Sequence, residues 1–342
     1  MIYILLGLVI IFIAYFEVFI KQKFSSKTVL GFLCVVLILF AGLRNKVGTD
    51  WNSYYEFYQL GVTNVEIGYA ELNNFFRGLE IHYNIFLIIL NSFSLWLMFQ
   101  FFNKNSEYKI IALLIFFSDL FLYFNLSGIR QAIATSITCF AFIYANNRKY
   151  YRFFICILIA MLFHLSAIIF ALAYFVPRTK LKIKHYGILL VGFLMLSLSF
   201  SFLTDFITAN TQKNADVYVN ALENSSNLPK LFAIGILKRV VIIIVVIYFS
   251  KSFFVNKFRH YIFNIYLFGF AFYCSTYLIS PDIGVRMSSY FTIFDTIVAG
   301  NLIMALKKTS ERIIIVTVFS AIAIYKLMGY MDNEYYIYNT IF

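Results

Sequence analysis

The sequence predicts an all-α integral membrane protein, a polytopic helical bundle with about 11–12 spans. Of its 342 residues, 62% are hydrophobic and 13% are charged, whereas soluble domains average about 25% charged residues. Apolar runs of roughly 15–20 residues recur along the chain, and short basic connectors separate them. Two soluble domains would fit the length but not this pattern. We therefore expect a single transmembrane domain over residues 1–342.

Helices are the expected elements because lipid offers main-chain groups no hydrogen-bond partner, and the runs lack the alternating pattern of barrel strands. The first run has no basic leading region and no small-residue cleavage site, so we expect a retained span and not a signal peptide. The predicted spans are residues 2–20, 28–43, 82–102, 110–125, 129–146, 186–204, 232–250, 261–280, 287–305 and 312–329.

The basic connectors predict how these spans are oriented, because lysine and arginine collect in cytoplasmic loops. The cytoplasmic set is Lys21, Lys23, Lys27, Lys104, Lys109, Arg148, Lys149 and Arg152. With these inside, Met1, the loop 44–81, the connector 205–231 and the tail 331–342 are outside. The net charge of +12 is thereby explained by topology and not by nucleic-acid binding.

Residues 153–176 need their own argument. If they crossed the membrane once, four basic residues would lie outside: Arg178, Lys180, Lys182 and Lys184. We therefore predict a helical hairpin that enters and leaves from the cytoplasmic side, with residues 163–166 at its tip. Each arm of about 11 or 12 residues would be roughly 18 Å long, so the hairpin is either re-entrant or crosses a thinned bilayer.

This topology gathers arginines and a histidine at the outer surface. Arg44 follows the second span, Arg130 opens the fifth, His164 caps the hairpin, and Asp282 and Arg286 flank an outer connector. A guanidinium presents a planar fork that matches phosphate oxygens, and it keeps its charge at any accessible pH. The pattern indicates a site for an anionic head group joined to a lipid tail.

Neither a cofactor nor a metal is expected. The cysteines lie in apolar runs without paired spacing, which argues against disulfides, zinc and redox chemistry: Cys34, Cys139, Cys156 and Cys274. The sequence also has no P-loop, no glycine-rich nucleotide turn and no carboxylates at metal-ligand spacing. These features disfavour a nucleotide-sugar donor.

Short motifs stand in a particular order along the chain. They are Gly42-Leu43-Arg44, Gly48-Thr49-Asp50 with Tyr54-Tyr55, Glu66-Ile67-Gly68-Tyr69, Ile129-Arg130-Gln131, the stretch 160–167 around His164, and Arg286 with Tyr290-Phe291. In this order on a polytopic scaffold they resemble the EpsG family of Wzy-type polymerases. That family joins lipid-linked oligosaccharide repeat units into O-antigen, capsule or exopolysaccharide. The resemblance covers about residues 42–291.

The resemblance implies a metal-independent, inverting glycosyltransferase on the outer face of the bacterial plasma membrane. Donor and acceptor would both be oligosaccharides linked to polyprenyl pyrophosphate, such as undecaprenyl pyrophosphate, and a chain-length regulator would be a protein partner. We assign the leaving pyrophosphate to Arg130, Arg286 and Arg44. His164 is our first choice of general base and Asp50 the second. Further site candidates are Gln131, Tyr54 and Asp282.

Each candidate also has a structural interpretation. Asp50 is suited to capping a helix or turn. Arg130 is suited to anchoring a helix end at the head groups. His164 fits a hydrogen-bonded structural role, and Arg286 fits an ion pair with Asp282 that pins the connector.

Other polar and aromatic residues remain open at this stage. The aromatic residues of the loop 44–81 fit an interfacial belt or a surface that stacks on sugars: Trp51, Tyr54, Tyr55, Phe57 and Tyr58. Glu80 and His82 are a reserve acid and base near the third span. Asp119 and Asp295 lie inside predicted spans, where an ionised acid is costly, and the sequence indicates no partner for either.

Two other classes of function share these features. A lipid-linked oligosaccharide flippase would use the same spans, arginines and lipid substrate. A translocator, however, is expected to show repeated halves and charges that reach the membrane midplane, and the sequence shows no clear internal repeat. A related envelope ligase or acyltransferase is the third alternative.

Overall fold

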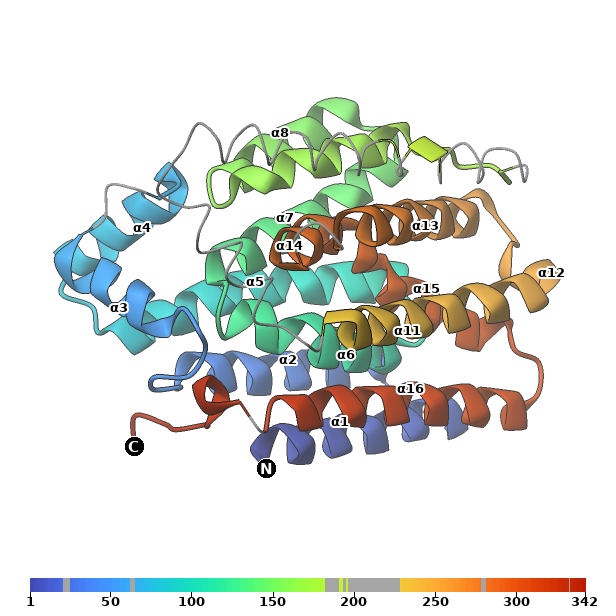
Figure 1. Cartoon of the computed structure of the whole chain (residues 1–342), viewed down its shortest axis with the longest axis horizontal. Helices are drawn as coiled ribbons and strands as arrows, with labels where there is room; N and C mark the ends of the chain where they lie inside the picture. Colours follow the sequence, from blue (N-terminus) through green and yellow to red (C-terminus); the bar gives the residue numbers. More distant parts are fainter. Residues whose placement is uncertain are drawn as a thin grey trace. The chain divides into compact units, whose positions relative to one another are not determined.

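The structure is a computed structural model that describes residues 1–20, 25–61, 65–181, 191–192, 195, 228–277, 281–331 and 333–342. Over these residues the chain is built from helices, and the one extended pairing there is an isolated β-bridge between Arg44 and Thr340. The predicted all-α class is therefore confirmed (Figure 1).

The helices form two compact units, which we describe separately. The first unit, Met1–Tyr174 with Thr296–Phe342, contains α1 (Ile2–Phe19), α2 (Ser26–Gly42), α3 (Trp51–Leu60), α4 (Ile67–Gly78), α5 (Tyr83–Asn105), α6 (Lys109–Phe116), a π-helix (Phe117–Asn125), α7 (Ile129–Asn146), α8 (Tyr150–Met161), a 3₁₀ helix (Leu165–Phe175), α16 (Thr309–Gly329) and a 3₁₀ turn (Glu334–Tyr336).

The second unit, Phe175–Asp295, contains α11 (Leu228–Tyr248), α12 (Ser250–Phe253), α13 (Lys257–Tyr277) and α14 (Pro281–Thr292). Helix α15 (Phe294–Ala305) begins in this unit and continues into the first. The single-domain organisation over 1–342 stays a prediction.

Most predicted spans coincide with helices. In the described part of the chain, three helices are long and apolar enough to cross a membrane, namely α1, α5 and α16. The span 110–125 is formed by α6 and the π-helix that continues it, and the span 287–305 divides between α14 and α15 at Ile293. The predicted span 186–204 and connector 205–231 lie outside the described residues, apart from residues 191, 192, 195 and 228–231.

The ends of the helices in the first unit lie in two groups, as the charges of the connectors predict. At one end, which we call the tail end, the C-terminal tail contacts three other segments. The Tyr3 hydroxyl donates to the main-chain oxygen of Tyr336 at 2.8 Å, and the Tyr336 hydroxyl lies 2.8 Å from Ser127 Oγ just before α7. The Asn45 N–H after α2 donates to Asn339 O at 2.9 Å. The start of α1, the end of α2, the start of α7 and the tail therefore share one end.

Other helix ends of the first unit meet at the end opposite the tail end. The buried carboxylate of Glu17, near the end of α1, accepts the N–H groups of Lys109 and Ile110 at 2.9 and 3.0 Å. These donors have no partner within α6 because they lie in its first turn. Asn301 of α15 donates to Asn105 O at the end of α5, at 2.7 Å. Alternate connectors thus lie at opposite ends, as a polytopic chain requires.

Residues 153–176 form the predicted helical hairpin. Phe153 at the start of α8 contacts Phe170 and Tyr174 on the returning arm, with ring centroids 6.1 and 5.6 Å apart. The turn between the arms falls at residues 162–164. The second arm is a 3₁₀ helix of 11 residues, about 22 Å long at a rise of about 2.0 Å. Both arms are thus shorter than the hydrocarbon core of about 30 Å.

The sequence predicted a loop over residues 44–81, and this prediction is wrong. The segment contains the short helices α3 and α4. Trp51, Tyr54 and Tyr58 of α3 are buried, and their spacing of three and four residues forms one helical face. Tyr58 stacks on Phe86 of α5 with ring centroids 5.0 Å apart. Aromatic packing therefore buries one face of α3 and holds it against α5.

The hairpin predicts the side on which Lys180 lies. In a background without the four native cysteines, we expect Lys180→Cys to resist a membrane-impermeant maleimide in intact cells and to react after permeabilisation. Lys180 is exposed in the structure, so burial would not explain protection. Lys46→Cys, at an exposed position of the tail end, is the matched control and should react in intact cells. Labelling of position 180 from outside would overturn the hairpin topology.

Candidate functional site

A glycine turn fixes the start of α3 against α7. Gly48 has φ +103°, and a Cβ there would lie 2.1 Å from the main-chain oxygen of Leu126. The Gly48 N–H donates to Tyr335 O at 2.7 Å, and the Thr49 N–H donates to Ser127 Oγ at 3.0 Å. Only glycine fits this close approach without strain. The turn therefore holds α3 next to the first turn of α7, which carries Arg130.

Arg130 lies directly after the start of α7 and contacts both helices of the 44–81 segment. Its Nε donates to the Tyr54 hydroxyl at 3.2 Å, and its guanidinium carbon lies 5.6 Å from the centroid of the Tyr54 ring. Its Nη1 pairs with Glu66 Oε2. The two side chains of this ion pair remain 24% and 21% exposed. The guanidinium is therefore held in place and is still accessible from outside the protein.

Glu66 links Arg130 to the hairpin tip. It precedes α4, and its Oε1 accepts the Leu165 N–H at 3.4 Å. The Gly68 N–H donates to Leu162 O at 2.8 Å. A Cβ on Gly68 would lie 2.7 Å from that same oxygen, so a larger residue would push α4 off the tip. The start of α4, the start of α7 and the hairpin tip therefore meet at one carboxylate.

His164 lies at this tip, next to the Leu165 amide that Glu66 accepts. Its Nδ1 is 2.6 Å from Ser166 Oγ, and its main-chain N–H donates to Ala160 O at 3.0 Å. The side chain is half-buried. The hydrogen bond to Ser166 orients the imidazole.

Asp50 does not act as a side-chain cap, although it holds the N-cap position of α3. Its Oδ1 accepts the Thr49 hydroxyl at 2.9 Å, and its main-chain oxygen accepts the Tyr54 N–H at 3.0 Å. One helical turn therefore separates Asp50 from the tyrosine that contacts Arg130. The side chain is half-buried, so it lies at the edge of the same region.

Arg44 is placed differently from Arg130. It is fully buried, its Nε donates to Val47 O at 3.2 Å, and its Nη1 donates to Ala41 O. Burial lowers the pKa of Arg44, yet an arginine remains charged in proteins. Tyr338 lies nearby; burial raises its pKa to about 12, and its hydroxyl donates to Phe40 O at 2.8 Å. Arg44 thus anchors the tail end, and we leave it out of the proposed pyrophosphate site.

The remaining candidates lie on α7 and α14. Gln131 follows Arg130 on α7 and is buried, with 2% of its surface exposed. Arg286 and Asp282 belong to α14 of the second unit, where Arg286 is half-buried and its main-chain oxygen accepts the Ser289 hydroxyl at 2.6 Å. The side chain of Asp282 is outside what the structure describes. Their joining the Arg130 site stays a prediction.

Sequence reasoning missed Glu66 as a site residue. Its signal was present, because Glu66 is the one acid in the Glu66-Ile67-Gly68-Tyr69 motif. The carboxylate accepts charge-assisted hydrogen bonds from a guanidinium and a main-chain amide. Phosphate oxygens accept the same kinds of donor. The donors that Glu66 accepts are therefore of the kind that also bind phosphate.

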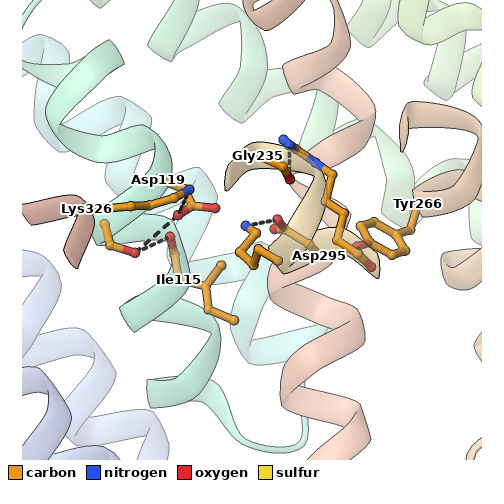
Figure 2. A network of polar contacts seen from close by, with 9 residues as sticks. Ile115, Asp119, Gly235, Tyr266, Asp295 and Lys326 are labelled. Atoms are coloured by element: carbon orange, nitrogen blue, oxygen red, sulfur yellow. Dashed lines mark hydrogen bonds and ion pairs between the residues drawn. The ribbon is translucent and has the colours of Figure 1, made fainter. Parts of the chain in front are cut away.

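The structure also supplies partners for both acids inside predicted spans (Figure 2). In the first unit, Lys326 Nζ donates to Asp119 Oδ1 at 2.6 Å, within the π-helix. In the second unit, Lys238 pairs with Asp295, and both side chains are only 3% exposed. An unpaired charge at either position would be costly. We interpret both pairs as structural.

The EpsG family matches residues 27–340 of the chain. No curated protein and no solved structure matches it.

The close approach at Gly68 predicts a stability difference between two glycines of the same helix. Gly68→Ala should lower the free energy of unfolding by about 1–3 kcal/mol, because the added methyl group meets Leu162. Gly78→Ala, the matched control, has no neighbouring atom within 4 Å and should be neutral or slightly stabilising. Denaturant unfolding of the purified proteins in detergent measures both. Equal stability of the two variants would contradict the contact between α4 and the tip.

Proposed function

The chain belongs to the EpsG family, and from this premise we propose that it polymerises polysaccharide repeat units, with Arg130 as the centre of its active site. Membership of this Wzy-type polymerase family supports a polysaccharide polymerase-type role in a membrane. The observation that carries the residue assignment is the meeting of Arg130, Glu66, Tyr54 and the hairpin tip at one partly exposed position. The reaction would be a glycosyl transfer between two oligosaccharides linked to polyprenyl pyrophosphate.

Charge stabilisation is the first task of the proposed site. When the sugar leaves its pyrophosphate, negative charge develops on the bridging and terminal oxygens. A fixed guanidinium in a partly desolvated position stabilises that charge without reorganisation. Arg130 is oriented by Tyr54 and Glu66 before substrate arrives. Arg286 as a second arginine stays the prediction made from the sequence.

Glu66 has a distinct role in this proposal. It keeps Arg130 paired in the empty enzyme, and the incoming pyrophosphate competes with it for the guanidinium and the Leu165 amide. A partly exposed ion pair contributes little stability, typically below about 1 kcal/mol. A substrate carrying more charge can therefore displace the carboxylate. Glu66 would then be a positioning residue and not a permanent ligand.

The acceptor hydroxyl must lose a proton as it attacks the anomeric carbon. We assign this proton to the imidazole of His164, with Asp50 as the alternative base. Neutral imidazole is suited to proton transfer near neutral pH. Direct attack would invert the anomeric centre. The proposal places charge stabilisation on arginine and involves no metal ion.

The surface around the tip suits an amphiphilic substrate. Leu162 and Leu165 of the tip and Ile67 of α4 are exposed, and they lie next to the polar contacts of Glu66 and Gly68. Apolar groups beside a cation match a lipid tail that ends in pyrophosphate. We propose that this end of the protein faces the outside of the bacterial plasma membrane, where a chain-length regulator would also bind.

The proposed role of Arg130 is tested in a deletion strain. We expect the deletion to leave a single repeat unit in place of long polymer, and Arg130→Lys at matched protein level to restore less than about one hundredth of the polymer. A lysine ammonium cannot reproduce the two-pronged phosphate contact. Arg148→Lys, which changes an exposed arginine of a basic connector, is the control and should restore polymer fully.

The glycan profile of these strains separates the competing functions. Complete loss of the repeat unit from the cell surface would point to a flippase. Normal polymer from the Arg130→Lys strain would reduce Arg130 to a structural anchor.

The assignment of His164 as the general base predicts a loss of polymerisation rate. His164→Ala should lower the polymerisation rate by about 10²–10⁴ while the lipid-linked substrate still binds, because only proton transfer is lost. Rates with purified protein and substrate binding measured separately test this. If His164→Ala polymerises normally and Asp50→Asn is inactive, the base is Asp50.

A further inference from the structure

A cavity separate from the Arg130 contacts lies among α3, α4 and the start of α5. Its volume is about 310 Å³, at the lower end of the range for small-molecule sites. The residues that carry the argument come from α3, α4 and the turn between α4 and α5: Tyr55, Tyr58, Gln59, Arg77, Glu80 and His82. Aromatic rings and both signs of charge therefore share one small opening.

We propose that this cavity is a saccharide-binding subsite that holds a sugar of the repeat-unit oligosaccharide, an inference that rests on the proposed function. Sugar rings present apolar C–H faces and hydroxyl groups that both donate and accept hydrogen bonds. Tyrosine rings offer a flat apolar contact surface at low entropic cost. Arg77 and Gln59 supply donors, and the Glu80 carboxylate supplies an acceptor.

The aromatic side of the cavity is held rigid. The Tyr55 ring is 39% exposed, stacks on Trp51 with centroids 5.0 Å apart, and meets the edge of Tyr83 at 5.3 Å. The Tyr58 hydroxyl donates to Ile81 O at 2.6 Å. Rings that are already fixed lose little freedom when a ligand binds, which favours affinity.

The polar side is also positioned by the fold. His82 Nδ1 accepts the Asn84 N–H at 3.3 Å, so a neutral His82 carries its proton on Nε2 and can donate it to a hydroxyl. Arg77 packs over Gly61, which has φ +81° and where a Cβ would lie 2.3 Å from Arg77 Nη1. Gly61 thus leaves room for the guanidinium at the cavity.

Glu80 stands where helices usually have glycine. Its φ is +53°, its N–H donates to Arg77 O at 2.9 Å, and the Ile81 N–H donates to Phe76 O at 3.2 Å. These two bonds form the Schellman motif that ends α4, and its left-handed position favours glycine. The glutamate in this position lines the cavity, so a glycine there would remove a carboxylate from the cavity and leave the turn intact.

Helix α3 connects this subsite to the proposed active site. Tyr54 contacts Arg130, whereas its neighbour Tyr55 lines the cavity. A single oligosaccharide chain whose pyrophosphate end lies at Arg130 therefore follows one short helix to reach the subsite. Of the aromatic residues of α3, Tyr55 and Tyr58 line the cavity, and Trp51 stacks on Tyr55.

The test uses Trp51 as a reporter. The chain has 2 tryptophans, so Trp96→Phe leaves Trp51 alone. The probe is the free oligosaccharide of one repeat unit, released from the polymer of the producing strain and lacking pyrophosphate. We expect saturable fluorescence quenching, and about tenfold weaker binding or more in Glu80→Gly. The glycine should leave the melting temperature unchanged or higher, so lost binding would not reflect lost folding.

Two controls decide the outcome. Glu71→Ala removes an exposed carboxylate of α4 outside the cavity and should bind the probe normally, whereas maltotriose should not quench Trp51. The absence of saturable binding, or equal binding by Glu80→Gly, overturns the subsite even if the strain polymerises normally. If the probe binds as expected but the deletion strain makes full-length polymer, the subsite stands and the polymerase function fails.

Discussion

A charge or hydrogen-bonding group without a partner is costly in a hydrocarbon environment, and the described helices are arranged so that this cost is avoided. Glu17 satisfies two N–H groups at the start of α6. Asp119 pairs with Lys326, and Asp295 pairs with Lys238. Each of these contacts joins elements far apart in the chain. Removing Lys238 or Asp295 would leave the other charged and buried, so this pair in particular ties α11 to the start of α15.

The Arg130–Glu66 pair obeys the same electrostatics with a different result. Its side chains are 24% and 21% exposed, whereas those of Lys238 and Asp295 are 3% exposed. Buried pairs resist exchange because separation leaves an uncompensated charge, while partly exposed pairs contribute little and can exchange partners. Exposure therefore separates the Lys238–Asp295 pair, which is closed to solvent, from the Arg130–Glu66 pair, whose two side chains a charged ligand can reach. It also separates Arg130 from Arg44, whose guanidinium is fully buried and bonded to carbonyl oxygens.

Two glycines determine how closely the parts of the proposed active site approach. Gly48 allows the segment before α3 to pack on Leu126, and Gly68 allows α4 to pack on Leu162. Both contacts are to main-chain oxygens, which cannot move aside as a flexible side chain would. Tyr54, Glu66 and the hairpin tip are thus placed around Arg130 by two kinds of feature. One is the absence of a side chain at Gly48 and Gly68, and the other is the polar groups themselves.

Composition and charge order alone determined the helical class, most span positions and the hairpin at residues 153–176, because hydrophobic run length and connector charge are local signals that one sequence displays directly. Arg130 was recognisable for the same reason, as an arginine at a span boundary. Tertiary structure alone decided that residues 51–60 and 67–78 are helices, that the Arg44 guanidinium is fully buried, and that Glu66 pairs with Arg130. It also supplied Lys326 for Asp119, 207 residues away, and Lys238 for Asp295, 57 residues away. Such pairings depend on which helices pack together, and no local pattern of residues encodes that choice.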